Sequence, residues 1–262
     1  MHKWTTALAL IVLLGTSAPG MAEDEVTLQY KFEKDKPLVY RLDMNTDATF
    51  TTPDGGVRKT QMTNYMELKQ ELIEAKEDGS ARIAITIEKA NQMVDGKPVS
   101  VPIEPGHSIL LTMKPNGEVV DGAGDLPSNN AQSQLQMVFP TEAVQKGTKW
   151  DRETMIQDPL PLKAVTRYLV RDIAADFPNY AGKTVHLVSA MGMENEALPT
   201  GEGVSSKTKG QIWFDSNAGC IVKSEAESDF QISIPINLQN ILPPNSVVKI
   251  DFHINVTIAL VQ

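Results

Sequence analysis

The sequence has a single cysteine, Cys220, among its 262 residues. This excludes an internal disulfide, so the fold must be held by a buried apolar core, which a chain of this length can form. Histidine is also scarce: apart from His2, the chain has only His107, His186 and His253. One cysteine and three dispersed histidines do not supply the clustered ligands of a structural zinc site. We interpret Cys220 as a small, half-buried apolar filler at the mouth of a hairpin, with a nucleophilic or intermolecular role as the alternative.

The common catalytic and nucleotide-binding motifs are missing as well. The chain has no G-x-S-x-G elbow, no H-E-x-x-H pair and no glycine loop that follows a strand and opens a helix. The segment DGAGD (121–125) fails the EF-hand pattern and reads as a polar turn. His186, Met191 and Met193 together offer soft ligands for Cu(I), but strand alternation would place His186 on the face opposite the two methionines. We therefore expect no metal, no cofactor and no enzyme activity; a hydrolase with a dispersed active site is the alternative.

Positive charge is in deficit. The chain carries 24 Lys and Arg against 33 Asp and Glu, a net charge of −9. Such a chain repels nucleic acid and anionic membrane surfaces, so neither is expected as a partner. The charges are scattered rather than collected in blocks, which is typical of solvated strand faces.

Long apolar runs are limited to residues 7–14 (ALALIVLL), near the N-terminus. Eight apolar residues are too few to span a bilayer as a helix, which needs roughly 20. His2 and Lys3 precede this run, and small residues and a proline follow it, as in a secretory signal peptide. We predict cleavage after Ala22 and an exported mature chain of residues 23–262, periplasmic or extracellular, with no transmembrane segment.

Alternation of apolar and polar residues dominates the rest of the sequence. It is present in 26–33 (VTLQYKFE) and 38–47 (LVYRLDMNTD), and it is clearest in 247–261 (VVKIDFHINVTIALV). In this last segment one face carries Ile250, Phe252, Ile254, Val256, Ile258 and Leu260, whereas the other carries Lys249, Asp251, His253, Asn255 and Thr257. Strands with one apolar and one polar face are typical of antiparallel sheets that meet water on one side.

Turn residues divide these segments into hairpins. Asp78-Gly79 and Asn116-Gly117 are strong hairpin signals. For residues 210–226 we predict a hairpin in which Ile212 faces Ser224 and Gly210 faces Ala226, with a three-residue loop, 217–219, that ends at a left-handed Gly219. One short helix is expected near 128–138. Loops are expected at 94–107, 156–163, 195–207 and 235–246.

These patterns predict an all-β fold with long antiparallel strands in a curved, barrel-like or two-lobed sheet, because strands of about fifteen residues accumulate twist and cannot stay flat. We expect a single β-rich domain over residues 23–262. Two related β-halves, about 23–107 and 140–262, are the alternative, since a weak internal similarity can reflect either a duplication or chance.

The candidate binding residues lie on the inner faces of the predicted strands. Bulky apolar groups at Tyr40, Met44, Met66 and Leu68 would line either a packed core or an apolar cavity. The small residues Ser224, Ala226 and Ser228 would either allow close packing of another element or form the floor of a cavity. The sequence leaves both alternatives open.

Two stretches carry a resemblance. LTMKPNGEVVDGAGD (111–125) with FPTEAVQKGTKWDRE (139–153), and GQIWFDSNAGCIVKSE (210–225) downstream, resemble a family of exported bacterial β-rich proteins of unknown function. Long coiled strands with one helix are also similar, at the level of the fold, to periplasmic lipoprotein carriers, in which an open barrel surrounds an acyl-binding cavity. The resemblance implies no catalytic residues.

Taken with the missing motifs, this favours a non-enzymatic binding or assembly module. It would hold an apolar small molecule or lipid, or a segment of a protein partner, on its concave face. A purely structural envelope protein that acts through exposed strand edges is a further alternative.

Overall fold

A computed structural model of the chain describes residues 25–101, 104–122, 137–156, 162–194, 203–236 and 246–261. These residues form twelve β-strands and no helix. The strands are β1 (Leu38–Thr51), β2 (Val57–Ala75), β3 (Ala81–Val94), β4 (Lys97–Val99), β5 (Ser108–Met113), β6 (Val119–Asp121), β7 (Lys149–Ile156), β8 (Leu162–Asp176), β9 (Lys183–Glu194), β10 (Gly203–Asp215), β11 (Cys220–Ile236) and β12 (Ser246–Val261).

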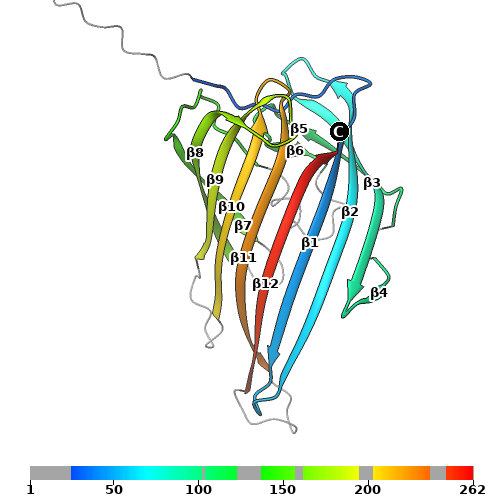
Figure 1. Ribbon diagram of the computed structural model, residues 1–262, viewed down its shortest axis with the longest axis vertical. Coiled ribbons are helices and arrows are strands. Elements are labelled where there is room, and N and C mark those ends of the chain that lie inside the picture. Colours follow the sequence, from blue (N-terminus) through cyan, green and yellow to red (C-terminus); the bar gives the residue numbers. More distant parts are fainter. Residues whose placement is uncertain are drawn as a thin grey trace, which may run out of the picture.

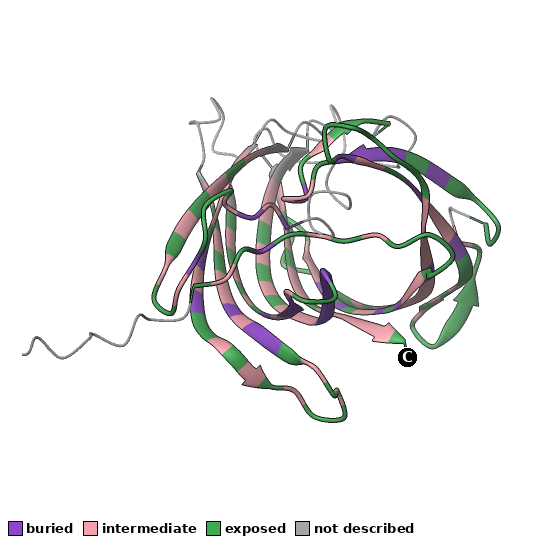
Figure 2. Ribbon diagram, turned by 90° about the horizontal axis from the view of Figure 1, so that it is seen from above, coloured by how far each residue is buried: buried purple, intermediate pink, exposed green. Residues whose placement is uncertain are grey.

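All twelve strands belong to one antiparallel sheet, which confirms the predicted fold class. The order is β6-β5-β3-β2-β1-β12-β11-β10-β9-β8-β7, and β4 pairs with β3 beside this path. The first and last long strands are neighbours, with Leu42 opposite Ile258 and Met44 opposite Val256. Figure 1 shows the long strands side by side, and Figure 2, seen from above, shows the sheet curling around a common interior. The curl gives the sheet a convex outer face and a concave inner face.

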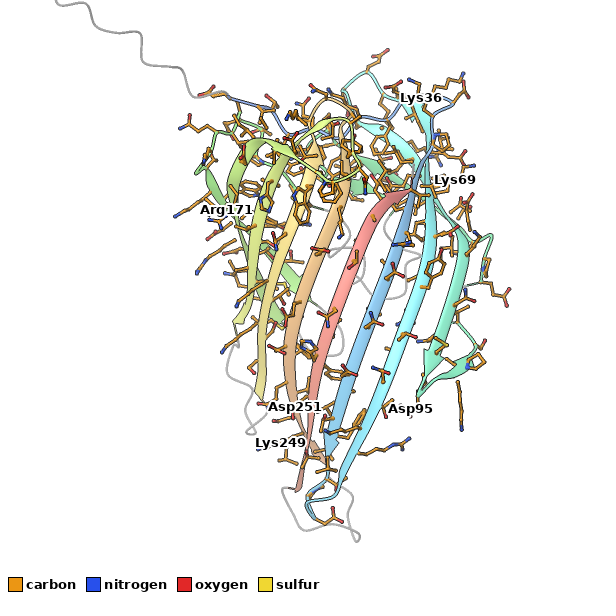
Figure 3. All side chains as sticks on the ribbon, in the orientation of Figure 1. Lys36, Lys69, Asp95, Arg171, Lys249 and Asp251 are labelled. Atoms are coloured by element: carbon orange, nitrogen blue, oxygen red, sulfur yellow. The ribbon has the colours of Figure 1, made fainter. Side chains whose placement is uncertain are left out.

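The predicted alternation sets these two faces. On the outer face of β12, Lys249, Asp251 and Asn255 are exposed, and Figure 3 shows Lys249 and Asp251 near the lower end of the long strands. Outer-face ion pairs include Lys223 with Glu225 at 2.5 Å and Lys89 with Glu67 at 2.8 Å. The inner face carries the apolar residues of each strand, so the concave side forms the interior of the fold.

The β10–β11 hairpin follows the predicted register except at its turn. Ile212 lies opposite Ser224 and Gly210 opposite Ala226, as expected. A bulge at Trp213 and Phe214 then shifts the pairing, so that Phe214 lies opposite Ile221 rather than Val222. The loop consequently has four residues, 216–219, instead of three. Gly219 has the predicted left-handed backbone, with φ of 68°.

The prediction of a strand at residues 26–33 is wrong, although its alternation is correct. Residues 25–34, which we call the crossing segment, run across one end of the sheet (Figure 1, dark blue) and make only isolated bridges. Its backbone bonds to three separate places: Val26 to Val144, the Tyr30 amide to the Pro115 carbonyl at 2.7 Å, and the Lys31 amide to the Gly219 carbonyl at 3.0 Å. Alternation reports which side chains are buried and does not require a neighbouring strand.

Glycines in two hairpin turns allow this close approach. Gly117 has φ of 93°, and a Cβ there would lie 2.7 Å from Tyr30 Cε2 of the crossing segment and 2.2 Å from the Met137 carbonyl oxygen. At Gly219 a Cβ would lie 2.4 Å from the Lys31 amide nitrogen. Side chains at either position would push the crossing segment away from the sheet.

The main core lies beneath the crossing segment. Leu28, Phe139 and Phe214 are almost fully buried there, and the ring of Tyr30 contacts both phenylalanines, with centroids 5.2 and 5.5 Å apart. Tyr40 and Leu68 belong to the same buried cluster, and Met66 packs against it. A smaller cluster joins Ile83, Leu111 and Met113 of β3 and β5.

Burial decreases along the inner face away from this core. Ile250, Phe252, Ile254 and Val256 of β12 share the concave face, as predicted, but each is only partly buried. Phe230 of β11 packs against Phe252, with ring centroids 6.1 Å apart, and is also only partly buried. The sheet therefore encloses an apolar surface that the described core does not completely fill.

Several predictions from the sequence fall outside the described residues. The signal peptide at 1–22 lies entirely outside the described residues, and so do residues 128–136 of the helix predicted at 128–138. Met137 and Val138 are described and are not helical. All four predicted loops are partly strand: β4 lies within 94–107, the ends of β7 and β8 fall within 156–163, β10 already begins at Gly203, and β11 continues to Ile236. In the described part of the chain, no helix is long and apolar enough to cross a membrane.

Candidate ligand-binding hollow

A hollow of about 190 Å³ lies on the concave face where β7 to β12 curve around the interior. Five apolar residues line it from β10, β11 and β12, namely Ile212, Ile221, Ile254, Val256 and Ile258. Met137, Ala164 and Met191 complete its apolar lining. We refer to this space as the hollow.

Small residues form the middle of its wall. Gly210, Ser224, Ala226 and Ser228 all line the hollow, and Gly210 lies opposite Ala226 in the sheet. A Cβ at Gly210 would lie 2.5 Å from Ser189 Oγ, so a larger residue here would require that hydroxyl to move. The small face of β11 thus borders open space, which is one of the two alternatives that the sequence left open.

Hydroxyl groups and one cation line the part of the hollow formed by β7, β8 and β9. Arg152, Thr154, Thr166, Tyr168 and Ser189 all contribute to it, and Thr208 of β10 continues the row of hydroxyls. Thr208 Oγ1 and Ser228 Oγ are hydrogen-bonded at 2.7 Å. The stacked rings of Trp150 and Tyr168, 5.0 Å apart, close this side toward the core.

The two tyrosines nearest this polar side are held neutral. Burial raises the pKa of Tyr168, and the positive charge of Arg152 partly offsets that effect. Burial also raises the pKa of Tyr30, again opposed in part by Arg152.

Of the candidate residues named from the sequence, the structure brings Ser224, Ala226 and Ser228 together on the hollow. Tyr40 and Leu68 lie in the packed core instead, and Met66 packs against that core. Met44 is on the inner face of β1, opposite Val256, but does not line the hollow. A direct role of these residues in ligand binding stays a prediction.

The three copper candidates do not converge. Met191 lines the hollow, and Met193 shares its face of β9, opposite Ala164. His186 points to the outer face, where its ring stacks on Trp213 at 5.0 Å and Nε2 lies 3.2 Å from Gln211 Oε1. Within the described residues, no group of three or more His, Cys, Asp or Glu side chains is arranged to hold a metal ion.

The remaining polar clusters lie outside the hollow. His253 Nδ1 is 2.9 Å from Asp229 Oδ1, and its Nε2 is 3.1 Å from Asn255 Nδ2, in a depression of about 410 Å³ on the outer face. Both ring nitrogens thus face groups other than a hydroxyl nucleophile. His107 is exposed in the loop before β5.

Cys220 lies at the β10–β11 turn, as predicted, but it is almost fully buried rather than half-buried. Burial is the largest cause that raises the pKa of its thiol, to about 11, and the charge of Asp215 adds to it. Asp215 is itself buried; it accepts a hydrogen bond from the Tyr180 hydroxyl at 2.8 Å and two more from the amides of Asn217 and Ala218. This network fixes the turn, and a protonated thiol is a poor nucleophile.

A larger groove, of about 950 Å³, lies beside β2, β3 and β4. Its lining mixes polar and apolar residues, and the polar ones include Asn45, Asn64, Asn91, Gln92 and Tyr65. The Tyr65 hydroxyl already donates to Glu67, and Met93 at its rim is exposed. The hollow is the better candidate because it combines an apolar wall with converging polar groups.

The sequence did not identify the polar side of the hollow. Thr166, Ser189 and Thr208 are ordinary residues of alternating strands, and only the fold brings them together. Arg152 did carry a signal, since it has the same strand parity as Trp150 and so faces inward with an aromatic residue.

Comparison with known proteins supports a relationship of fold only. Neither protein-family models nor curated protein sequences match the chain. A solved structure of lipid–protein interactions in lipovitellin matches 88% of this chain with a TM-score of 0.50 at 10% sequence identity. The chain spans only about a quarter of that protein, since the match covers 26% of the lipovitellin chain.

A structure of DynF from the dynemicin biosynthesis pathway of Micromonospora chersina covers 94% of this chain and 91% of DynF at 9% identity. Its TM-score of 0.20 is too low to indicate a common fold. Because no family model or curated sequence matches, membership of an exported bacterial β-rich family stays a prediction. The chain is similar in fold to a part of lipovitellin.

Proposed function

We propose that this protein is an exported, non-enzymatic binding module that holds an apolar ligand of lipid type on its concave face. The observation that carries the proposal is the partly buried inner face of β12, from Ile250 to Val256, which continues into the hollow. Apolar side chains left partly exposed inside a curved sheet favour an apolar occupant, because transfer of apolar surface out of water is favourable.

The size of the hollow indicates how such a ligand would lie. At about 190 Å³ it is smaller than most small-molecule sites, which are roughly 300–1,000 Å³. One end of the ligand would occupy the hollow, and the rest would lie along Ile250, Phe252 and their neighbours. The fold-level similarity to a part of lipovitellin, described for its lipid–protein interactions, supports a ligand of this class.

A binding role is favoured over catalysis by what surrounds the histidines. His253 and His186 lie on the outer face, and their ring nitrogens face Asp229, Asn255 and Gln211. General acid–base or nucleophilic catalysis requires a base within reach of a hydroxyl or of a bound substrate. The hollow has no histidine among its described lining residues.

The proposal is tested by filling the hollow. Ala226→Phe places a ring on its wall, whereas Ala190→Phe makes the same change at an exposed position on the outer face of β9. Binding of the neutral fluorophore N-phenyl-1-naphthylamine is measured for both variants and for the unaltered protein. We expect Ala226→Phe to lose about tenfold or more in affinity and Ala190→Phe to bind normally.

Equal binding by the two variants would place the probe elsewhere, and no binding by the unaltered protein would refute the proposal. Unfolding curves for both variants show whether a loss of binding reflects a loss of fold. Native mass spectrometry of protein from its own host supplies an independent test, in which a co-purifying mass of lipid size is expected. Sequencing the N-terminus of the same sample tests export, with Glu23 expected as the first residue.

A further inference from the structure

The lining of the hollow changes from polar to apolar across the sheet. One row of paired inner-face residues runs Arg152, Thr166, Met191, Thr208, Ser228 and Ile254, from β7 to β12. The next row passes from Tyr168 through Ser189, Gly210 and Ala226 to Val256. The β7 end of the lining therefore carries hydroxyls and a cation, whereas the β12 end is apolar.

Arg152 gives the polar end its positive charge. It stands on β7, the edge strand of the sheet, on the same face as Trp150, and it is partly buried. The other charged residue in the described lining is Glu225, whose carboxylate pairs with Lys223 on the outer face. Arg152 has a partner within the chain as well, but a guanidinium has five N–H donors and can bind more than one acceptor.

The dimensions fit a single chain with a small head group. Neighbouring strands lie about 4.8 Å apart, so the five steps from β7 to β12 cover roughly 24 Å along the curved sheet. One acyl chain occupies about half of a hydrocarbon layer that is roughly 30 Å thick, or about 15 Å. The path therefore accommodates one extended chain together with a head group at the Arg152 end. At about 190 Å³ the hollow would hold the head group and the start of the chain, and the rest of the chain would lie along the partly buried face of β12, as proposed above.

A carboxylate matches this end of the hollow better than a neutral polar group. Guanidinium and carboxylate are planar and form paired N–H···O bonds, which are about twice as strong as bonds between neutral groups. The hydroxyls of Thr166 and Ser189, which line the same side, are further donors to an anionic oxygen.

From these observations we infer that the hollow binds a long-chain carboxylate, with its head group at Arg152 and its chain directed toward Ile254 and Val256. The inference rests on the proposed function, since it specifies the class of apolar ligand for the same surface. It also specifies the orientation of the ligand: the anionic head group lies at the edge strand β7, and the chain extends toward β12.

The test compares palmitate with methyl palmitate as competitors of N-phenyl-1-naphthylamine. The two ligands share one chain and differ in the charge of the head group. We expect the unaltered protein to bind palmitate at least about tenfold more tightly than its ester. This comparison needs no variant, so it holds even if a substitution prevents folding.

Two matched variants then locate the anion. Arg152→Gln removes the inward charge, and Arg167→Gln removes an exposed charge on the outer face of the adjacent strand, where Arg167 lies 3.6 Å from Asp151. We expect Arg152→Gln to weaken palmitate binding by about tenfold or more, without affecting the ester. Arg167→Gln should leave both affinities unchanged.

Each outcome has one meaning. If neither ligand displaces the probe and the probe itself does not bind, the proposed function fails. If palmitate and its ester bind equally, the proposed function stands and the head-group inference is overturned. The same holds if palmitate is preferred but Arg152→Gln binds it normally. Hexadecyl phosphate is the third competitor: tighter binding than palmitate that depends on Arg152 would replace the carboxylate by a phosphate.

Discussion

Replacing Leu28 tests whether the crossing segment is an integral part of the core. Its side chain is fully buried although it belongs to no strand, and it shares a cluster with Phe139 and Phe214. Leu28→Ala removes three carbons from a site enclosed by the sheet and residues 137–144. Buried leucine-to-alanine changes cost about 3–5 kcal/mol when the surroundings cannot collapse, so we expect a loss in this range.

The assay is urea unfolding at equilibrium, followed by circular dichroism. The midpoint should fall with little change in slope, because the surface exposed on unfolding stays nearly the same. For a chain of this size, each kcal/mol also lowers the melting temperature by roughly 2–4 °C. Gln29→Ala, at the exposed neighbouring position, should stay within about 0.5 kcal/mol of the unaltered protein. A loss at Leu28 of less than about 1 kcal/mol would mean that the crossing segment is not packed as described.

Three other substitutions or reactions examine single features. Gly219→Ala should destabilise the protein by about 1–3 kcal/mol, and by more than Gly147→Ala, because both have positive φ but only the Gly219 methyl meets the crossing segment; equal losses in urea would contradict this. Cys220 should resist a thiol reagent at about pH 8 until urea unfolds the chain, since burial raises its pKa to about 11, and rapid labelling of the folded protein would disprove it. The hydrogen bond to Asp229 raises the pKa of His253, so its contribution is complete below the unfolded pKa of about 6.5 and disappears as pH rises through the folded value. His253→Gln should therefore lower the unfolding midpoint at about pH 5.5 but not at about pH 9, and a larger effect at the higher pH would reverse the assigned sign.

The strands were predictable because local alternation and turn chemistry agree with the final fold. In β12, each alternate residue from Ile250 to Leu260 lies on the inner face, and in the β10–β11 hairpin Gly219 has the backbone that a tight turn demands. The bulge at Trp213 was not predictable from local pattern. It shifts the pairing by one residue while Phe214 stays in the core, a balance that depends on tertiary packing.

The hollow could be predicted only in part. Ser224, Ala226 and Ser228 stood out as small residues on one face, but the sequence does not say what lies opposite them. That depends on the curl of the sheet, which brings Thr166 of β8 to the same hollow as Ile254 of β12. Tyr40 and Leu68 were equally reasonable lining residues, yet the crossing segment covers their end of the sheet and makes them core.

The pairing of β1 with β12 limits when the single sheet can be completed during folding. The permanent neighbour of β1 is β12, which follows it by nearly 200 residues in the chain. Until β12 is in place, the two halves of the sheet expose unsatisfied edges, which are prone to aggregate. A chain truncated before Ser246 would lack the strand that joins them, so the single sheet requires β12 to be present.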